Sequence, residues 1–120
     1  MSTQKITDVT PIPLSVLIRT LNEADRIVAT LKSAQALGGE IIVIDAGSTD
    51  DTIKICEAHG ARVIHNPWPG FGPQRHFGEE QCKFDHVFSL DADEVLPAPM
   101  AAEIRSHFLP GPPPRLLNIR

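Results

Sequence analysis

The sequence predicts one α/β domain built on a parallel, Rossmann-like sheet with the strand order 3-2-1-4. Short aliphatic runs alternate with helix-length amphipathic segments, which is the pattern of strands joined by crossover helices. Polar residues follow the runs at the ends where parallel strands place their ligand crevice. With 120 residues there is room for a single domain. We divide it into an N-terminal extension (1–12), the nucleotide-binding-type α/β domain (13–108) and a proline-rich tail (109–120). We interpret the tail as the start of a further segment that has been truncated.

The first strand and helix have clear signals. The run Leu14–Ile18 predicts a strand, and a helix follows because apolar residues recur at three- and four-residue steps. These residues are Ala24, Ile27, Val28, Leu31 and Ala34. Asn22 is predicted to cap the start of this helix, with Asp25 completing a capping box. Gly38 and Gly39 are predicted to end it.

A second strand and helix repeat the pattern. Residues 40–45 form a continuous apolar run, typical of a strand buried on both faces of a parallel sheet. Ser48 is predicted to cap the next helix, with Asp51 at the capping-box position, and the helix ends near His59. Residues 62–65 form the third strand.

The last part of the domain contains a loop and one more strand. Prolines and glycines over 66–73 predict a loop, followed by a short helix over 74–82. Residues 87–90 form the fourth strand, and a helix runs from Pro97 to about Phe108. Three consecutive prolines preclude regular structure just beyond it.

Composition restricts the class of partner and the compartment. There are 15 acidic and 11 basic side chains, a balance that disfavours nucleic acid as the main partner. No aliphatic run approaches the roughly 18 to 20 residues that span a bilayer, and no signal peptide is visible. We therefore expect a cytoplasmic protein. Cys56 and Cys82 match no metal spacing, so we interpret them as reduced thiols, with a disulfide as the alternative.

Polar residues gather at the predicted carboxyl ends of three strands. They are Thr20, Asn22 and Glu23 after the first strand, Asp45 at the end of the second, and Asp91, Asp93 and Glu94 after the fourth. Crowded carboxylates repel one another unless a cation offsets them. Their oxygens suit Mg²⁺ or Mn²⁺, completed by substrate phosphates. A turn followed by a helix cap is the competing interpretation of the last cluster.

Three stretches together resemble family 2 glycosyltransferases of the GT-A fold. They are Leu14-Ser-Val-Leu-Ile-Arg-Thr-Leu-Asn-Glu23, Ile42-Val-Ile-Asp-Ala-Gly-Ser-Thr-Asp-Asp-Thr52 and Phe88-Ser-Leu-Asp-Ala-Asp-Glu94. The resemblance covers about residues 13 to 97, the nucleotide-sugar-binding half. The loop Trp68-Pro-Gly-Phe-Gly-Pro-Gln-Arg75 and the stretch around Asp45 are most similar to the bacterial branch that builds the lipopolysaccharide core.

The resemblance implies roles for individual residues. Thr20, Asn22 and Glu23 match the segment that lines the nucleoside pocket, and Asp45 matches the aspartate that hydrogen-bonds the base, usually uracil. Arg75 matches the basic residue beside the donor diphosphate, although a solvated helix-face arginine is the alternative. Asp93 matches the direct metal ligand. Asp91 matches a position nearer the ribose or the water shell of the metal.

Several positions depart from the family pattern. Arg19 stands where proline is frequent, Leu21 where tyrosine is frequent, and Ala46 where a second aspartate is frequent. The general base of the inverting enzymes lies well downstream of the metal motif. Glu103 is the only carboxylate after Glu94, and it falls in the middle of a predicted helix, so no catalytic residue is assigned.

The resemblance implies an inverting transferase that uses a nucleotide-diphosphate sugar, in practice a UDP-sugar, and a divalent metal. The acceptor would be a glycan or lipid-linked glycan of the lipopolysaccharide core, reached at the cytoplasmic face of the inner membrane. A non-catalytic, degenerate nucleotide-binding fragment is the main alternative. A truncated sheet would also expose an edge through which copies of the chain associate.

Two phosphotransferase alternatives explain less of the sequence. Residues 90–95 also fit the Asp-x-Asp signature of haloacid-dehalogenase-type enzymes, with Asp91 as a covalent nucleophile. Asp45 could likewise be a receiver-type phosphoacceptor. Haloacid-dehalogenase-type enzymes need a lysine downstream of the nucleophile, and this sequence has none after Lys83.

Overall fold

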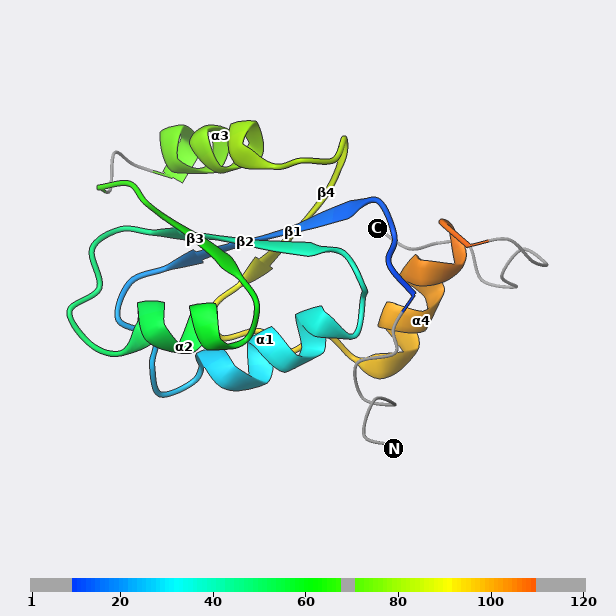
Figure 1. Cartoon of the computed structure of the whole chain (residues 1–120), viewed down its shortest axis with the longest axis horizontal. Coiled ribbons are helices and arrows are strands. Elements are labelled where there is room, and N and C mark those ends of the chain that lie inside the picture. Colours follow the sequence, from blue (N-terminus) through cyan, green and yellow to red (C-terminus); the bar gives the residue numbers. More distant parts are fainter. Residues whose placement is uncertain (1–9, 68–70, 110–120) are drawn as a thin grey trace.

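The computed structural model describes residues 10–67 and 71–109. Within them, four parallel strands form one sheet in the order β3-β2-β1-β4, so the predicted α/β fold and strand order are confirmed (Figure 1). The strands are β1 (Leu14–Thr20), β2 (Glu40–Asp45), β3 (Arg62–His65) and β4 (His86–Asp91). In the register, Arg19 lies beside Ile44 on β2 and beside Asp91 on β4.

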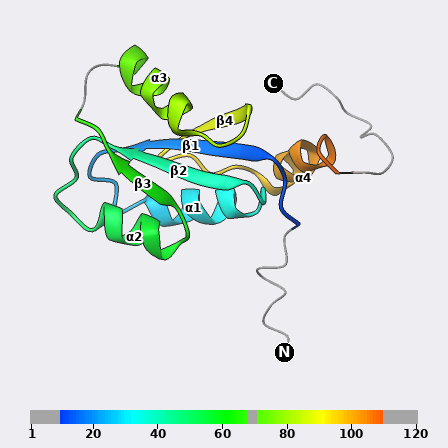
Figure 2. The same ribbon diagram turned by 45° about the horizontal axis from the view of Figure 1, so that its top comes forward.

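Helices cover the two faces of this sheet unequally. The helices are α1 (Ile27–Gln35), α2 (Thr52–Ala58), α3 (Phe71–Gln81) and α4 (Ala98–Ser106). α1 and α2 lie under one face and α3 lies over the other, whereas α4 sits beside the end of the sheet where β1 begins (Figures 1 and 2). α4 therefore lies at the opposite end of the sheet from the carboxyl end of β1 (Figure 1).

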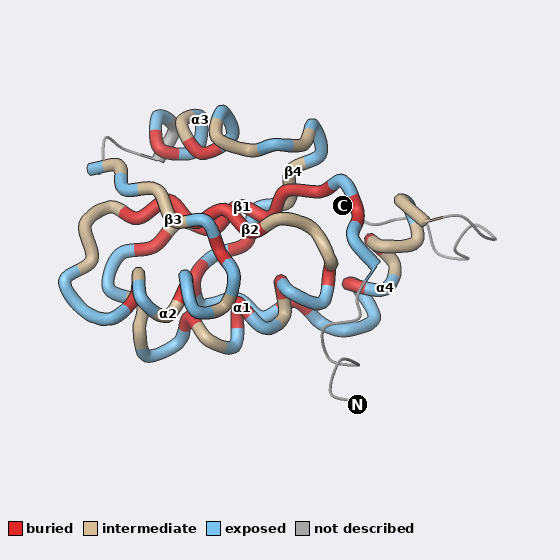
Figure 3. Tube along the Cα trace, viewed as in Figure 1, coloured by how far each residue is buried: buried red, intermediate tan, exposed pale blue. Residues whose placement is uncertain are grey.

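The core follows the alternation of side chains along the central strands. Val16 and Ile18 of β1 pack on the α1 side with Leu31, while Leu17 packs on the α3 side with Ile42. All five side chains are at most 2% exposed (Figure 3). Burying each such aliphatic side chain contributes about 1.5–3 kcal/mol, so this central pair of strands is a rigid platform for the residues that follow it.

Gly39 marks a point where the chain between α1 and β2 passes close to β1. A Cβ atom at this position would lie 2.2 Å from the Leu14 carbonyl oxygen, so no larger residue fits without movement of the backbone. The preceding Gly38 has a φ of 81°, a left-handed conformation that glycine adopts at low cost. α1 itself ends at Gln35 with Ala36 as its C-cap, so the glycines predicted to end the helix lie two to three residues beyond this cap, in the connection to β2.

Both predicted helix caps are wrong. α1 has Arg26 at its N-cap rather than Asn22, α2 has Asp51 rather than Ser48, and neither cap makes a side-chain hydrogen bond. Instead, the backbone amide of Asn22 donates to the Ser48 hydroxyl, and that hydroxyl donates to the Asp45 carboxylate. Short polar side chains satisfy backbone groups wherever the tertiary structure brings them, and here that partner is distant in sequence.

The third helix begins earlier than predicted. α3 starts at Phe71, inside the stretch 66–73 predicted as a loop. Pro73 lies in its first turn, where the missing N–H has no helical partner in any case, so proline does not prevent the helix. β4 and α4 lie within two residues of their predicted bounds.

Some predictions fall on residues outside the described ranges. These are most of the N-terminal extension, Trp68–Gly70 of the quoted loop, and the tail from Pro110 onward. Cys56 and Cys82 are free thiols, as predicted, and burial raises the pKa of Cys56 to about 11. No helix in the described part of the chain has the length and apolarity to cross a membrane.

Candidate functional site

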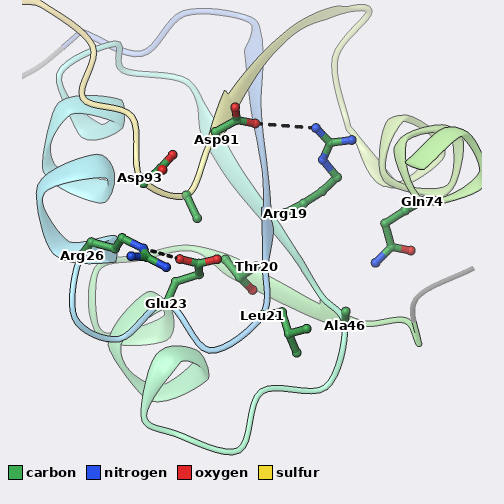
Figure 4. Close-up of a pocket in the computed structure, with 10 residues that line it drawn as sticks. Arg19, Thr20, Leu21, Glu23, Arg26, Ala46, Gln74, Asp91 and Asp93 are labelled. Carbon is green, nitrogen blue, oxygen red and sulfur yellow. Dashed lines mark hydrogen bonds and ion pairs between the residues drawn. The ribbon is translucent and has the colours of Figure 1, made fainter. Parts of the chain in front are cut away.

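A pocket of about 460 Å³ opens at the carboxyl ends of β1 and β4. Its described lining is Arg19, Thr20, Leu21, Glu23, Arg26, Ala46, Gln74, Asp91, Ala92 and Asp93 (Figure 4). The predicted convergence of polar residues at this edge therefore occurs, because parallel strands deliver their C-terminal residues to the same rim. Four of the predicted site residues line the pocket: Thr20, Glu23, Asp91 and Asp93.

Thr20 and Asp45 join the ends of β1 and β2 beneath the pocket. The Thr20 hydroxyl donates to Asp45 Oδ1 at 2.6 Å, and the Ser48 hydroxyl donates to the same oxygen at 2.6 Å. The backbone amides of Gly47 and Ser48 donate to Oδ2 at 2.9 and 2.7 Å. One carboxylate thus fixes the turn that follows β2 to the end of β1.

The environment of Asp45 keeps it ionised. Its side chain is fully buried, which raises the pKa, but the hydrogen bonds from Ser48, Thr20 and Gly47 outweigh burial and lower the pKa below its ordinary value. To bond a nucleobase, this carboxylate would have to give up one of four donors. Ala46, the next residue, does line the pocket. Base contact by Asp45 stays a prediction, and the structure gives the residue a structural role.

Asn22 holds two loops together at the rim. It has a left-handed φ of 54°, and its side-chain oxygen accepts from the amides of Thr49 and Asp50 at 2.8 and 3.3 Å. The backbone amide of Asn22 donates to Ser48 Oγ at 2.8 Å. Asn22 therefore shapes the rim through the β2–α2 loop and is absent from the described lining of the pocket.

Two arginines offset the acidic groups of the pocket. Arg26 donates to Glu23 through Nε at 2.7 Å. Arg19 Nη2 lies 3.7 Å from Asp91 Oδ1, and Asp91 is 66% exposed (Figure 4). The pocket therefore presents three carboxylates and two guanidinium groups, a set that can bind a phosphate together with a cation.

Two hydrogen bonds, one from α1 and one to Glu94, hold the turn that follows β4. The Thr30 hydroxyl of α1 donates to the Ala92 carbonyl at 2.8 Å, and the Asp91 amide donates to the Glu94 carboxylate at 2.8 Å. The members of the acidic cluster therefore differ in their surroundings, and a metal role for any of them stays a prediction. Glu94 stabilises the turn, whereas Asp91 and Asp93 are exposed and line the pocket.

The comparisons with known proteins decide the family. The family model described as glycosyl transferase family 2 matches residues 15–108. This chain belongs to glycosyl transferase family 2. The match spans every element from β1 to α4, so the family 2 assignment includes all of the residues that line the pocket.

Relatives and solved structures give the same assignment. An uncharacterized glycosyltransferase of Rickettsia felis is 42% identical over 79% of this family 2 chain and 34% of its own length. The lipopolysaccharide core biosynthesis glycosyltransferase LpsC of Rhizobium meliloti is 34% identical over 71% of this chain and 33% of its own. Glucosyl-3-phosphoglycerate synthase of Mycobacterium tuberculosis, solved with Mn²⁺, UDP and glucosyl-3-phosphoglycerate, superposes with a TM-score of 0.63 at 33% identity. That superposition covers 74% of this chain and 36% of the synthase.

The family 2 chain thus spans about a third of the length of the relatives it matches. Of the three carboxylates in its described pocket, Glu23 is paired with Arg26, so Asp91 and Asp93 are the candidates for holding a divalent ion. The described residues include no group of three or more His, Cys, Asp or Glu placed for a metal. Mg²⁺ is usually held by one or two carboxylates with substrate phosphates as further ligands. The pair therefore fits a metal shared with a bound diphosphate better than a metal held by protein alone.

Arg75 differs from its predicted place. Its side chain is 60% exposed and pairs with Glu79, one helical turn further along α3, at 3.3 Å. It is not among the described residues that line the pocket. This geometry is that of a solvated helix-face arginine, the alternative given above, and a diphosphate role for Arg75 stays a prediction.

Sequence reasoning missed the two arginines that do line the pocket. Arg19 was noted only as a departure from the family pattern, and Arg26 lies at the start of α1. The signal for Arg19 was its position directly before Thr20 at the end of a central strand. Gln74 was also missed, because its amide is fully buried against Asn66 and no local pattern predicts that contact.

Proposed function

We propose that this chain is the donor-binding part of an inverting glycosyltransferase that uses a nucleotide-diphosphate sugar, a UDP-sugar, and Mg²⁺ or Mn²⁺. The observation that carries the proposal is the pocket at the ends of β1 and β4, whose lining combines the exposed carboxylates Asp91 and Asp93 with Arg19 and Arg26. The similarity to a synthase solved with Mn²⁺ and UDP supports the choice of ligand.

Five of the predicted site residues have a proposed task. Thr20, Asn22 and Glu23 shape the nucleoside end, the first two through their bonds to the β2–α2 turn. Asp93 would bind the metal directly, with Asp91 near the ribose or a metal-bound water. The ion would supply positive charge opposite the diphosphate, which becomes more negative as the sugar leaves.

Inverting transfer forms one bond and breaks another at the anomeric carbon. The acceptor oxygen attacks while the bond to the diphosphate oxygen breaks, and a base must take the proton of the acceptor. Glu103 lies on α4, which contributes no described residue to the pocket. We therefore assign the base to no residue of this chain.

The acceptor that we propose is a glycan or lipid-linked glycan of the lipopolysaccharide core. The support is the 34% identity to LpsC and the quoted branch-like stretches. Such an acceptor would bring the protein to the cytoplasmic face of the inner membrane as a peripheral partner. A second candidate is nucleotide binding without transfer, because Glu103, the only carboxylate after Glu94, lies on α4, from which no described residue lines the pocket.

Calorimetric titration of UDP tests the donor-site proposal. We expect UDP to bind in the presence of Mn²⁺, and to bind about tenfold or more weakly in excess chelator. Asp93→Asn should reduce binding in Mn²⁺ to the chelator value. Asp85→Asn is the matched control, because it removes the same charge from an exposed residue just before the other end of β4.

The possible results separate the candidates. Absence of UDP binding by the folded protein would refute the donor-site proposal. Metal-dependent binding with no sugar transfer to lipopolysaccharide-core acceptors would favour the non-catalytic candidate.

A further inference from the structure

We infer that the groove between β4 and the end of α4 is a docking surface for residues 115–120 of the same chain, which lie outside the described ranges. The groove has a volume of about 530 Å³, and the apolar part of its described lining is Leu14, Val87, Phe88, Ile104 and Phe108. It shares no described residue with the candidate donor pocket. The inference therefore goes beyond the proposed function and does not depend on it.

β4 is the edge strand of the sheet within the described part of the chain. It pairs with β1 on one side, and no described strand lies on its other side. Every residue of β1 except Arg19 is buried, whereas Leu90 is the one buried residue of β4. Alternate residues of a strand direct their backbone N–H and C=O groups to opposite edges. The outer edge of β4 can therefore pair with a further segment.

The core is open along β4 on both faces of the sheet. Phe88 is half-buried against the apolar cluster on the α1 side, and Val87 is half-buried against the cluster on the α3 side. Phe108, just beyond α4, packs on the first cluster and meets the His86 ring edge to face, with 5.3 Å between the ring centroids. An aliphatic segment along β4 would remove more of this apolar surface from water.

The chain carries an aliphatic segment to this groove. The described residues end at Leu109, directly after Phe108, which lines the groove. Residues 110–114 follow, four of them proline, and five residues span at most about 16 to 18 Å. This length is enough to bring residue 115 beside β4. Proline cannot donate to a ladder of hydrogen bonds, so pairing with β4 would begin only after residue 114.

Residues 115–120 suit the groove in length, pattern and charge. They read Arg-Leu-Leu-Asn-Ile-Arg, six residues for the six of β4. Because side chains alternate along an extended segment, Leu117 and Ile119 would share one face and could both enter the groove. The segment has two basic residues and no acidic one, whereas the exposed Asp85 and Asp91 stand just before β4 and at its last position.

Covalent connection favours this segment over the edge of a second copy. A segment held by a short linker has an effective concentration of the order of millimolar. That concentration exceeds the concentration of free copies in an ordinary protein solution. Docking within one chain should therefore prevail over pairing between copies, and we expect a monomer in which β4 is protected.

Amide hydrogen exchange of the full chain tests the docking. We expect the amides on the outer edge of β4 to be protected in the wild-type chain. Leu117→Asp should accelerate their exchange about tenfold or more, because a charge in the apolar groove would displace the segment. The amides of β2 are the internal reference, since β2 pairs on both sides and should exchange as in wild type. Asn118→Asp is the matched control, because it adds the same charge to the opposite face of the segment.

Each other outcome also decides the question. Rapid exchange at the outer edge of β4 in the wild-type chain, or equal exchange in wild type and Leu117→Asp, would overturn the inference. Protection that increases with protein concentration, together with a dimer in gel filtration, would overturn it in favour of a second copy. If Leu117→Asp unfolds the whole chain, Leu117→Ala takes its place. It should accelerate exchange in β4 several-fold and leave β2 unchanged, and no acceleration in β4 would refute the docking.

Discussion

The Thr20 hydroxyl and the Asp45 carboxylate, which are 25 residues apart in sequence, form a buried hydrogen bond of 2.6 Å that joins β1 to β2 under the pocket. The same carboxylate accepts from Ser48 and from two backbone amides, so it connects three segments of the chain. The floor of the candidate site and the stability of the fold therefore depend on one ionised group.

Replacement of Asp45 should destabilise the protein. In Asp45→Asn, one of the two acceptor oxygens becomes an NH2 group, which cannot accept from the donors on its side, and the negative charge that all four donors stabilise is lost. We expect the free energy of unfolding to fall by about 3 kcal/mol, measured by urea denaturation. Thr20→Val removes only one of the four bonds and should cost about 1 kcal/mol. Equal stability of Asp45→Asn and wild type would show that the carboxylate is not needed for the fold.

The contribution of Asp45 to the free energy of unfolding should depend on pH. Its pKa in the folded protein lies below the ordinary value of 3.8, so ionised Asp45 stabilises the folded state above that value. The stabilisation is lost as the pH falls through the lowered pKa. The difference in unfolding free energy between wild type and Asp45→Asn should therefore be constant above about pH 5 and shrink as the pH falls from there through the lowered pKa.

Comparing wild type with Asp45→Asn cancels the contribution of other titrating groups to the pH dependence of stability. The pKa of Asp50 is also lowered, through its hydrogen bond from Thr52, but Asp50 is present in both proteins. A difference that stays constant over the whole range would mean that Asp45 titrates alike in the folded and unfolded states.

Much of the fold could be predicted because its causes are local. The run Ile41–Ile44 is apolar on both faces, and the glycines after α1 mark a helix end, so each element carries its own signal. The meeting of Thr20 with Asp91 and Asp93 at one rim followed from parallel strand geometry. These inferences need no knowledge of side-chain contacts.

The missed features all depend on contacts between distant residues. Asn22 has the local pattern of a helix cap, yet it accepts from Thr49 and Asp50 across the pocket rim. Ser48 is likewise drawn to Asp45. Arg75 matched a family position, but its surroundings on α3 are an exposed helix face. Local sequence describes what a side chain can do, and tertiary structure selects among these options.

Gly39 should be intolerant of even one added carbon. In Gly39→Ala the new Cβ would lie 2.2 Å from the Leu14 carbonyl oxygen and 3.2 Å from its Cβ. Relief requires a shift of β1 or of the α1–β2 connection, and we expect a loss of about 2 kcal/mol in unfolding free energy. Gly60→Ala is the control, since Gly60 has a φ of 85° but no atom within 4 Å of an added Cβ. It should cost about 1 kcal/mol from backbone strain alone. A smaller loss at Gly39 than at Gly60 would contradict the close approach.

Binding of Mn²⁺ should depend on nucleotide. Asp91 and Asp93 supply two carboxylates, and the described residues offer no third acidic, histidine or cysteine ligand grouped with them. A diphosphate would provide the remaining oxygens, so saturating UDP should raise the Mn²⁺ affinity about tenfold or more, by the same factor that Mn²⁺ raises the UDP affinity. The signal of free Mn²⁺ in electron paramagnetic resonance measures this affinity directly. Asp93→Asn should abolish the effect of UDP and Asp85→Asn should preserve it. Equal Mn²⁺ affinity with and without UDP would mean that the two carboxylates do not share a metal with the nucleotide.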